Sequence, residues 1–87
     1  MKISSAKDIN IEDNVFNGDL ILYGEYGKTL LSLDGNKFKG AFVADGVEFY
    51  SSRGNDWNKD KIYIKNCNGM PVWMANIKKD IKEFRGY

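Results

Sequence analysis

The feature of this 87-residue chain that most constrains its fold is the spacing of its turns. Asp34-Gly35 and Asp45-Gly46 lie eleven residues apart, and each pair separates two short apolar segments. Glycine adopts positive φ angles at little steric cost, so an Asp-Gly pair readily forms the tight turn of a β-hairpin. Turns at this spacing are typical of an antiparallel β-meander, in which each strand pairs with the next one along the chain.

The segments between the turns alternate apolar and polar residues with the period of a β-strand. Residues 61–65 (KIYIK) show this best, because Ile62 and Ile64 share one face while Tyr63 lies on the other. Patterns of this kind predict about five to six strands. We place them over residues 19–24, 28–33, 37–44, 47–52, 61–65 and 71–75, with a further short edge strand over residues 9–12. The sequence shows no strong internal repeat.

The C-terminal segment changes to a helical period. Ile77, Ile81 and Phe84 recur at i, i+4 and i+7, and Asn76 is placed to cap a helix. A helix this short gains most of its stability by packing its apolar stripe on another element. We therefore expect an α+β fold that is mostly β. Residues 1–87 would form a single domain, an antiparallel β-meander sheet with a short C-terminal α-helix packed on one face.

The chain has no histidine and one cysteine, Cys67. Ser-His-Asp and Cys-His mechanisms require an imidazole base, and a structural zinc site requires four nitrogen or sulfur ligands. A single cysteine cannot form a disulfide within the chain, so we expect Cys67 to be an inert thiol. The established catalytic and nucleotide-binding motifs are also missing from the sequence. We therefore expect a protein that is not an enzyme and that uses neither a metal nor a cofactor.

Hydropathy and charge bear on location and partners. The N-terminal residues lack the apolar stretch of a signal peptide, and the longest apolar run, residues 20–23, is far shorter than the about 20 residues of a membrane span. We expect a cytoplasmic protein that does not contact a membrane. The net charge is +1, but residues 1–36 carry −3 and residues 37–87 carry +4. This asymmetry fits either a polar binding surface or an ordinary mixed surface.

The side chains most informative about function lie on the outward face of the predicted sheet. If the apolar residues of each strand face the core, the same alternation directs aromatic and basic side chains outward. A tryptophan in an otherwise polar loop joins them, and we expect its ring either to fold back over the core edge, which we favour, or to anchor a partner. The candidate binding residues are Trp73, Tyr63, Tyr50, Lys61, Lys65, Lys39 and Trp57.

Three interpretations fit this set of residues. Tyrosine and tryptophan are enriched at the hot spots of protein interfaces, rings and lysines together bind single-stranded nucleic acid, and lysine-rich sheet faces are often simply solvated. Because the net charge is only +1, we favour a protein partner over nucleic acid.

We therefore expect a small non-enzymatic binding protein, monomeric or homodimeric, that acts through a protein–protein interface. Inhibition of a host protein by a phage-encoded or mobile-element-encoded chain is one such use. The alternative is a single-stranded nucleic-acid-binding module with an OB-like sheet.

Overall fold

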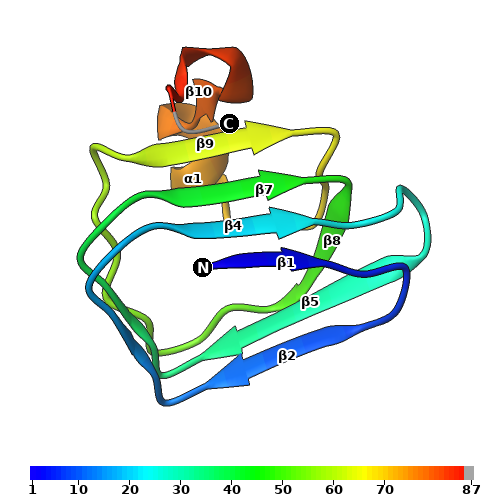
Figure 1. The fold of residues 1–87 in the computed structure, drawn as a ribbon, viewed down its shortest axis with the longest axis horizontal. Coiled ribbons are helices and arrows are strands. Elements are labelled where there is room, and N and C mark those ends of the chain that lie inside the picture. Colours follow the sequence, from blue (N-terminus) through cyan, green and yellow to red (C-terminus); the bar gives the residue numbers. More distant parts are fainter. Residues whose placement is uncertain (86–87) are drawn as a thin grey trace.

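A computed structural model describes residues 1–85 and shows a parallel, solenoid-like stack of strands (Figure 1). The strand pairs among these residues are parallel. Each strand pairs with one from the next coil, where a coil is one full turn of the chain around the solenoid axis. Leu20 pairs with Phe42, and Phe42 pairs with Ile62, so the chain returns to an equivalent position after 22 and then 20 residues. The predicted antiparallel meander is therefore wrong, whereas the mostly-β composition is confirmed.

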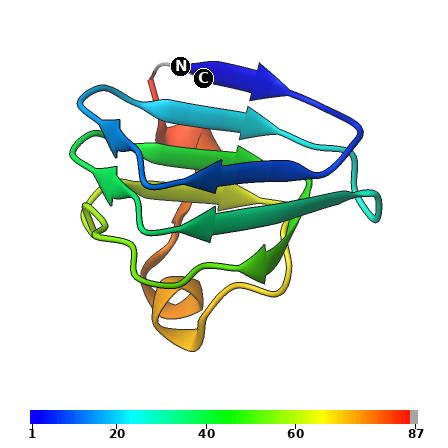
Figure 2. The ribbon, with the colours of Figure 1, turned by 90° about the horizontal axis from the view of Figure 1, so that it is seen from below.

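Three sheets form the walls of the solenoid, and the chain passes from one wall to the next within each coil (Figure 2). The first wall contains β1 (Lys2–Ser4), β4 (Leu20–Tyr23), β7 (Phe42–Asp45), β9 (Ile62–Lys65) and β10 (Lys79–Asp80). The second contains β2 (Ile9–Glu12), β5 (Thr29–Asp34) and β8 (Val47–Ser51), and the third contains β3 (Val15–Phe16) and β6 (Lys37–Phe38). The coils therefore stack in sequence order along one axis.

The Asp-Gly pairs turn the chain at corners between walls instead of reversing it in hairpins. Gly35 (φ 70°) lies between β5 and β6, and Gly46 (φ 75°) lies between β7 and β8. The N–H of Gly46 donates to the carbonyl of Lys65 in the next coil at 3.0 Å. The N–H of Gly35 likewise donates to the carbonyl of Arg53 at 2.9 Å. The expected positive φ angles are present, but a local φ preference does not specify which strand the next segment pairs with.

A third glycine explains why residues 37–44 do not form one strand. They divide into β6 and β7, and Gly40 lies at the corner between them. A Cβ at Gly40 would come within 2.5 Å of the carbonyl oxygen of Gly18 in the preceding coil. The two backbones therefore approach closely at this corner, which requires glycine.

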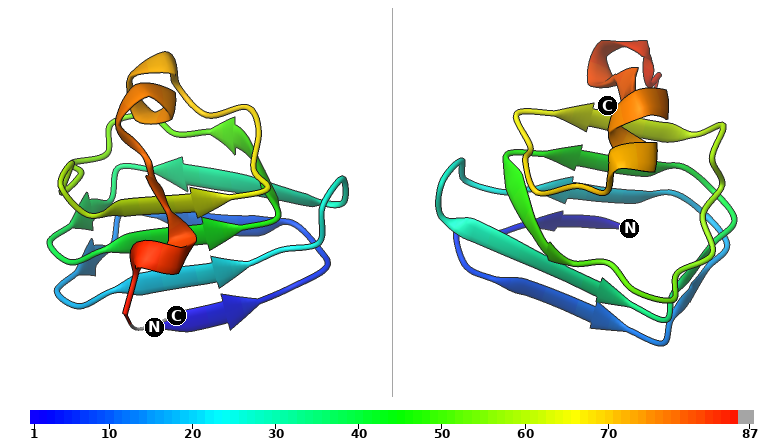
Figure 3. Two further views of the ribbon diagram at one scale, coloured as in Figure 1. Left: turned by 90° about the horizontal axis from the view of Figure 1, so that it is seen from above. Right: turned by 180° about the vertical axis from the view of Figure 1, so that it is seen from behind.

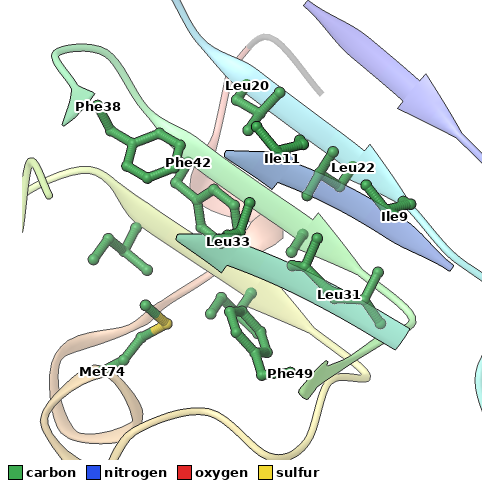
Figure 4. Close-up of a cluster of buried hydrophobic side chains, with 14 residues drawn as sticks. Ile9, Ile11, Leu20, Leu22, Leu31, Leu33, Phe38, Phe42, Phe49 and Met74 are labelled. Carbon is green, nitrogen blue, oxygen red and sulfur yellow. The ribbon is translucent and has the colours of Figure 1, made fainter. Parts of the chain in front are cut away.

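The hydrophobic core fills the interior of the coils (Figure 4). Alternate residues of each strand point inward, as the period-2 pattern predicts. Each such side chain contributes about 1.5–3 kcal/mol when fully buried. The largest fully buried apolar side chains of this interior core are Phe42, Leu20, Leu22, Leu31, Leu33, Ile62, Met74 and Val47.

A short repeat, missed in the sequence, marks equivalent corners of three coils. At its centre, Asn36 is buried, and its side chain accepts from the N–H of Asn14 at 2.9 Å and donates to the carbonyl of Ile11 at 2.8 Å. The side chain of Asn55 donates to the carbonyl of Leu33 at 2.7 Å. This asparagine ladder satisfies backbone groups that the corners leave outside the strand ladders. The repeats are residues 13–16 (DNVF), 35–38 (GNKF) and 54–57 (GNDW).

The C-terminal segment differs most from expectation. Residues 71–75 were predicted as a strand, but they begin α1 (Val72–Ile77), with Pro71 immediately before it. Proline suits the start of a helix as well as the start of a strand, since its missing N–H is not needed at either. α1 lies at the C-terminal end of the stack (Figure 2). Its residue Met74 is fully buried in the core (Figure 4). The solenoid thus uses a helix to cover its last coil.

The helix predicted from Asn76 onward is also wrong, because Asn76 lies inside α1. The chain continues through β10 to the 3₁₀-helix η1 (Ile81–Glu83), which crosses the outer face of the first wall (Figure 3). There Ile81 packs with Ile21 and Val43 in a second, smaller apolar cluster. No helix within residues 1–85 is long and apolar enough to cross a membrane.

Candidate functional site

A column of aromatic rings runs along one corner of the solenoid. Phe16, Phe38 and Trp57 occupy equivalent positions in three successive coils. The ring centroids of Phe16 and Phe38 are 5.4 Å apart, and those of Phe38 and Trp57 are 4.5 Å apart, both in stacked orientation. Trp57 also meets Phe42 edge-on at 5.0 Å. Trp57 therefore folds back on the core, and these ring contacts fix its position.

Trp73 meets the end of this column from α1. Its ring centroid lies 5.9 Å from that of Trp57, at an interplanar angle of 60°. Both tryptophans are only partly buried. They border a hollow of about 370 Å³, which we call the tryptophan cleft and which is lined by Ser52, Gly54, Asn55, Asp56, Trp57, Lys59 and Trp73. The tertiary structure thus brings together two candidate residues that are sixteen positions apart in sequence.

The polar residues of the tryptophan cleft divide into structural groups and exposed groups. The side chain of Asn55 is held in the asparagine ladder, where it donates to the carbonyl of Leu33. The ammonium of Lys59 lies 5.1 Å from the ring centroid of Trp73, a cation–π arrangement that keeps the charge beside the cleft. Lys59 and Asp56 both have exposed side chains. The tryptophan cleft therefore offers two apolar rings, one cation and one anion to a ligand.

Three further candidate residues lie on the outer face of β9 or immediately before it. Tyr63 and Lys61 line a second hollow of about 390 Å³. The Tyr63 ring lies 5.2 Å from that of Phe84, and the ammonium of Lys79 lies 5.8 Å from it. Contacts with the C-terminal segment therefore cover part of the Tyr63 ring. Lys65, at the end of β9, lines a third hollow of about 330 Å³.

The last two candidate residues lie apart from these hollows. Tyr50 is 76% exposed on β8, in the second wall, and Lys39 is exposed between β6 and β7. The predicted continuous face does not form, because the walls of a solenoid face different directions. Side chains that share strand parity therefore share a surface only when their strands belong to the same wall.

Two ionisable groups have displaced pKa values of structural origin. Asp34 Oδ1 accepts from Ser51 Oγ at 2.7 Å and from the N–H of Arg53 at 3.1 Å, and these bonds lower the pKa of the carboxyl group. Burial raises the pKa of the Cys67 thiol, which favours the unreactive neutral form. Within residues 1–85, no three or more His, Cys, Asp or Glu side chains group closely enough to hold a metal ion.

Sequence reasoning missed Lys59 and Asp56. Asp56 directly precedes Trp57 and Lys59 follows it two positions later, and polar residues close to a tryptophan in a loop were the available signal. No protein-family model, curated protein or solved structure matches the chain.

Proposed function

We propose that this chain is a non-enzymatic binding protein that holds a segment of a partner protein in the tryptophan cleft. The observation that carries the proposal is the pair of partly exposed rings, Trp57 and Trp73, in contact at the border of one hollow. Tryptophan is among the residues most enriched at binding hot spots. A hollow of about 370 Å³ is large enough to receive one or two side chains of a partner segment.

The rigidity of both rings supports the same proposal. Trp57 is held by Phe38 and Phe42, and Trp73 belongs to a helix that is anchored in the core by Met74. Rings that are already fixed lose little conformational entropy when a partner binds. Lys59 beside Trp73 supplies a charged group at the rim, where charges favour correct orientation and fast association.

The test uses the folded chain and a random peptide library displayed on phage. Peptides selected on the wild-type chain should bind Trp73→Ala about 30-fold more weakly, which is the loss of one hot spot of about 2 kcal/mol. Tyr50→Ala is the matched control, because Tyr50 is an exposed aromatic residue on another wall. Circular dichroism and thermal melting establish that each variant is folded.

A second variant tests the tryptophan cleft without removing a packed ring, so that a loss of folding cannot account for weaker binding. Lys59→Gln removes the cation at the rim without removing a ring, and it should weaken the same peptides and slow their association. If the selected peptides bind Trp73→Ala and Lys59→Gln as tightly as they bind the wild-type chain, the tryptophan cleft is not the contact site. A hydrolytic or transfer activity that one acidic substitution abolishes would overturn the non-enzymatic assignment.

Binding of single-stranded nucleic acid is the second candidate function, now without the OB-like sheet, which the solenoid contradicts. Lys61 lies immediately before β9 and Lys65 at its end, on either side of Tyr63, and this arrangement of a ring between lysines favours the candidate. It predicts salt-sensitive oligonucleotide binding that weakens in Tyr63→Ala. No binding at low salt eliminates it.

We propose that the chain binds its partner protein in the cytoplasm. A single cysteine, with a thiol held neutral by burial, suits the reducing cytoplasm. The chain would act there as a monomer or homodimer, and occupation of a partner's surface is the means by which it would inhibit that partner.

A further inference from the structure

The uneven charge of the sequence becomes a charge gradient in space. Because the coils stack in sequence order, residues 1–36, with a charge of −3, form the first coil and much of the second. Residues 37–87 carry +4 and include β9, α1 and η1 at the other end of the stack. A chain with a net charge of only +1 therefore has a basic pole.

Four lysines line one hollow at this basic pole. The hollow has a volume of about 330 Å³ and is bordered by Ile64, Lys65, Ala75, Lys78, Lys79, Asp80 and Lys82. The lysines come from the end of β9, the C-terminus of α1, β10 and η1, which converge only in the folded chain (Figure 3). The lining residues include four lysines and one aspartate, so their formal charges sum to +3. We call this site the lysine hollow.

The carboxylates near the lysine hollow have structural roles. Asp80 Oδ1 accepts from the N–H of Lys82 at 2.9 Å, and Glu83 Oε2 accepts from the N–H of Asp80 at 3.2 Å. Together they form the capping box of η1. Asp45 lies opposite Lys65 in the register of β7 and β9, where it accepts from Asn66 at 3.5 Å. These acids lower the local charge without removing its positive sign.

Within residues 1–85, no salt bridge joins Lys65, Lys78 or Lys82 to a carboxylate. The ion pair recorded among residues 1–85 joins Lys28 to Glu25, in the second coil. Lys79 is engaged, since its ammonium donates to the carbonyl of Asp60 at 2.9 Å. The carbonyl groups at the C-terminal end of α1 favour a nearby cation, which accounts for a lysine at position 78. That explanation does not extend to Lys65 and Lys82, which come from other elements.

We propose that the lysine hollow binds a compact phosphate-bearing anion. Lysines that border one hollow carry like charges that repel one another, and an anion with several charged oxygens would relieve that repulsion while it accepts their hydrogen bonds. Among residues 1–85, those that line the hollow include no aromatic ring, so they recognise charge and offer no platform on which a base could stack. A small polyphosphate therefore fits it better than a nucleic-acid strand.

The experiment titrates the intact chain with pyrophosphate at low salt and measures heat by calorimetry and amide shifts by NMR. Shifts should concentrate at residues around the lysine hollow. The double variant Lys78→Gln, Lys82→Gln should bind at least tenfold more weakly. The control Lys2→Gln, Lys7→Gln removes the same two charges from exposed positions at the opposite pole, and its affinity should stay within twofold of the wild-type value.

A second arm uses a single-stranded oligothymidine probe. Competition between pyrophosphate and this probe supports the proposal, because a backbone phosphate would then occupy the same hollow. Binding of the oligonucleotide without binding of pyrophosphate overturns the assignment in favour of nucleic acid. No pyrophosphate binding, or equal losses in the two double variants, also overturns it. These outcomes are independent of the tryptophan cleft, which none of the substitutions touches.

Discussion

Replacing Asn36 tests whether the asparagine ladder holds the coils together. Asn36 is 1% exposed and lies in the middle coil of the ladder. In Asn36→Ala, the carbonyl of Ile11 loses its buried donor and the N–H of Asn14 loses its acceptor. An unsatisfied, fully buried group costs about 1–3 kcal/mol, and a lost hydrogen bond at a partly buried group costs about 0.5–1.5 kcal/mol. We therefore expect the free energy of unfolding to fall by about 2–4 kcal/mol.

Urea denaturation followed by tryptophan fluorescence measures this change, since Trp57 lies in the adjacent aromatic column. The matched control is Asn17→Ala at an exposed position, where a change within about 0.5 kcal/mol is expected. Asn36→Asp keeps an acceptor for Asn14 but removes the donor to Ile11 and buries a charge, so it should be no more stable than the alanine variant. An Asn36→Ala chain within 0.5 kcal/mol of wild type would refute this account of the ladder.

Two further predictions concern the C-terminal segment and the pH dependence of folding. Ile81→Ala should lower the free energy of unfolding by about 2–5 kcal/mol, because Ile81 is 1% exposed. The change in Ile77→Ala should be far smaller, because Ile77 is 39% exposed. Equal losses of the two variants in denaturant melts would contradict the packing of η1. The pKa of Asp34 is lowered in the fold, so its contribution to stability is complete above about pH 4 and disappears as the pH falls through the lowered pKa. An NMR titration of its carboxyl carbon should show this low midpoint, and a midpoint at the ordinary value would disprove the role of Ser51 and Arg53.

Strand positions could be read from the sequence because side-chain alternation is a local property. The segments containing Leu20, Leu31, Val47 and Ile62 are strands, and their inward-facing apolar residues are buried. Positive φ at Gly35 and Gly46 was likewise predictable, since it depends on the lack of a side chain. Trp57 and Trp73 were recognisable as candidate binding residues, because tryptophan is rarely placed in polar or exposed segments without a packing or binding role.

Pairing partners could not be read in the same way. Neither an Asp-Gly turn nor an alternating strand specifies whether the next segment folds back beside its predecessor or continues to a new wall. The asparagine and aromatic repeat did carry this information, because stacking equivalent residues is what a solenoid requires. It recurs at only two of four positions and at unequal spacings of 22 and 19 residues, so it is weak in a single sequence.

The sequence by itself determined the positions of β2, β4, β5, β8 and β9 and of the Asp-Gly turns, which side chains of those strands enter the core, and that imidazole chemistry is excluded. These features follow from local backbone preference, side-chain period and composition. Tertiary structure alone decided the parallel stacking, the helix that covers the last coil, and the meeting of Trp57 with Trp73 and of the lysines around their hollow. Each of these depends on contacts between residues far apart in sequence, whose free energy is gained only when the coils assemble.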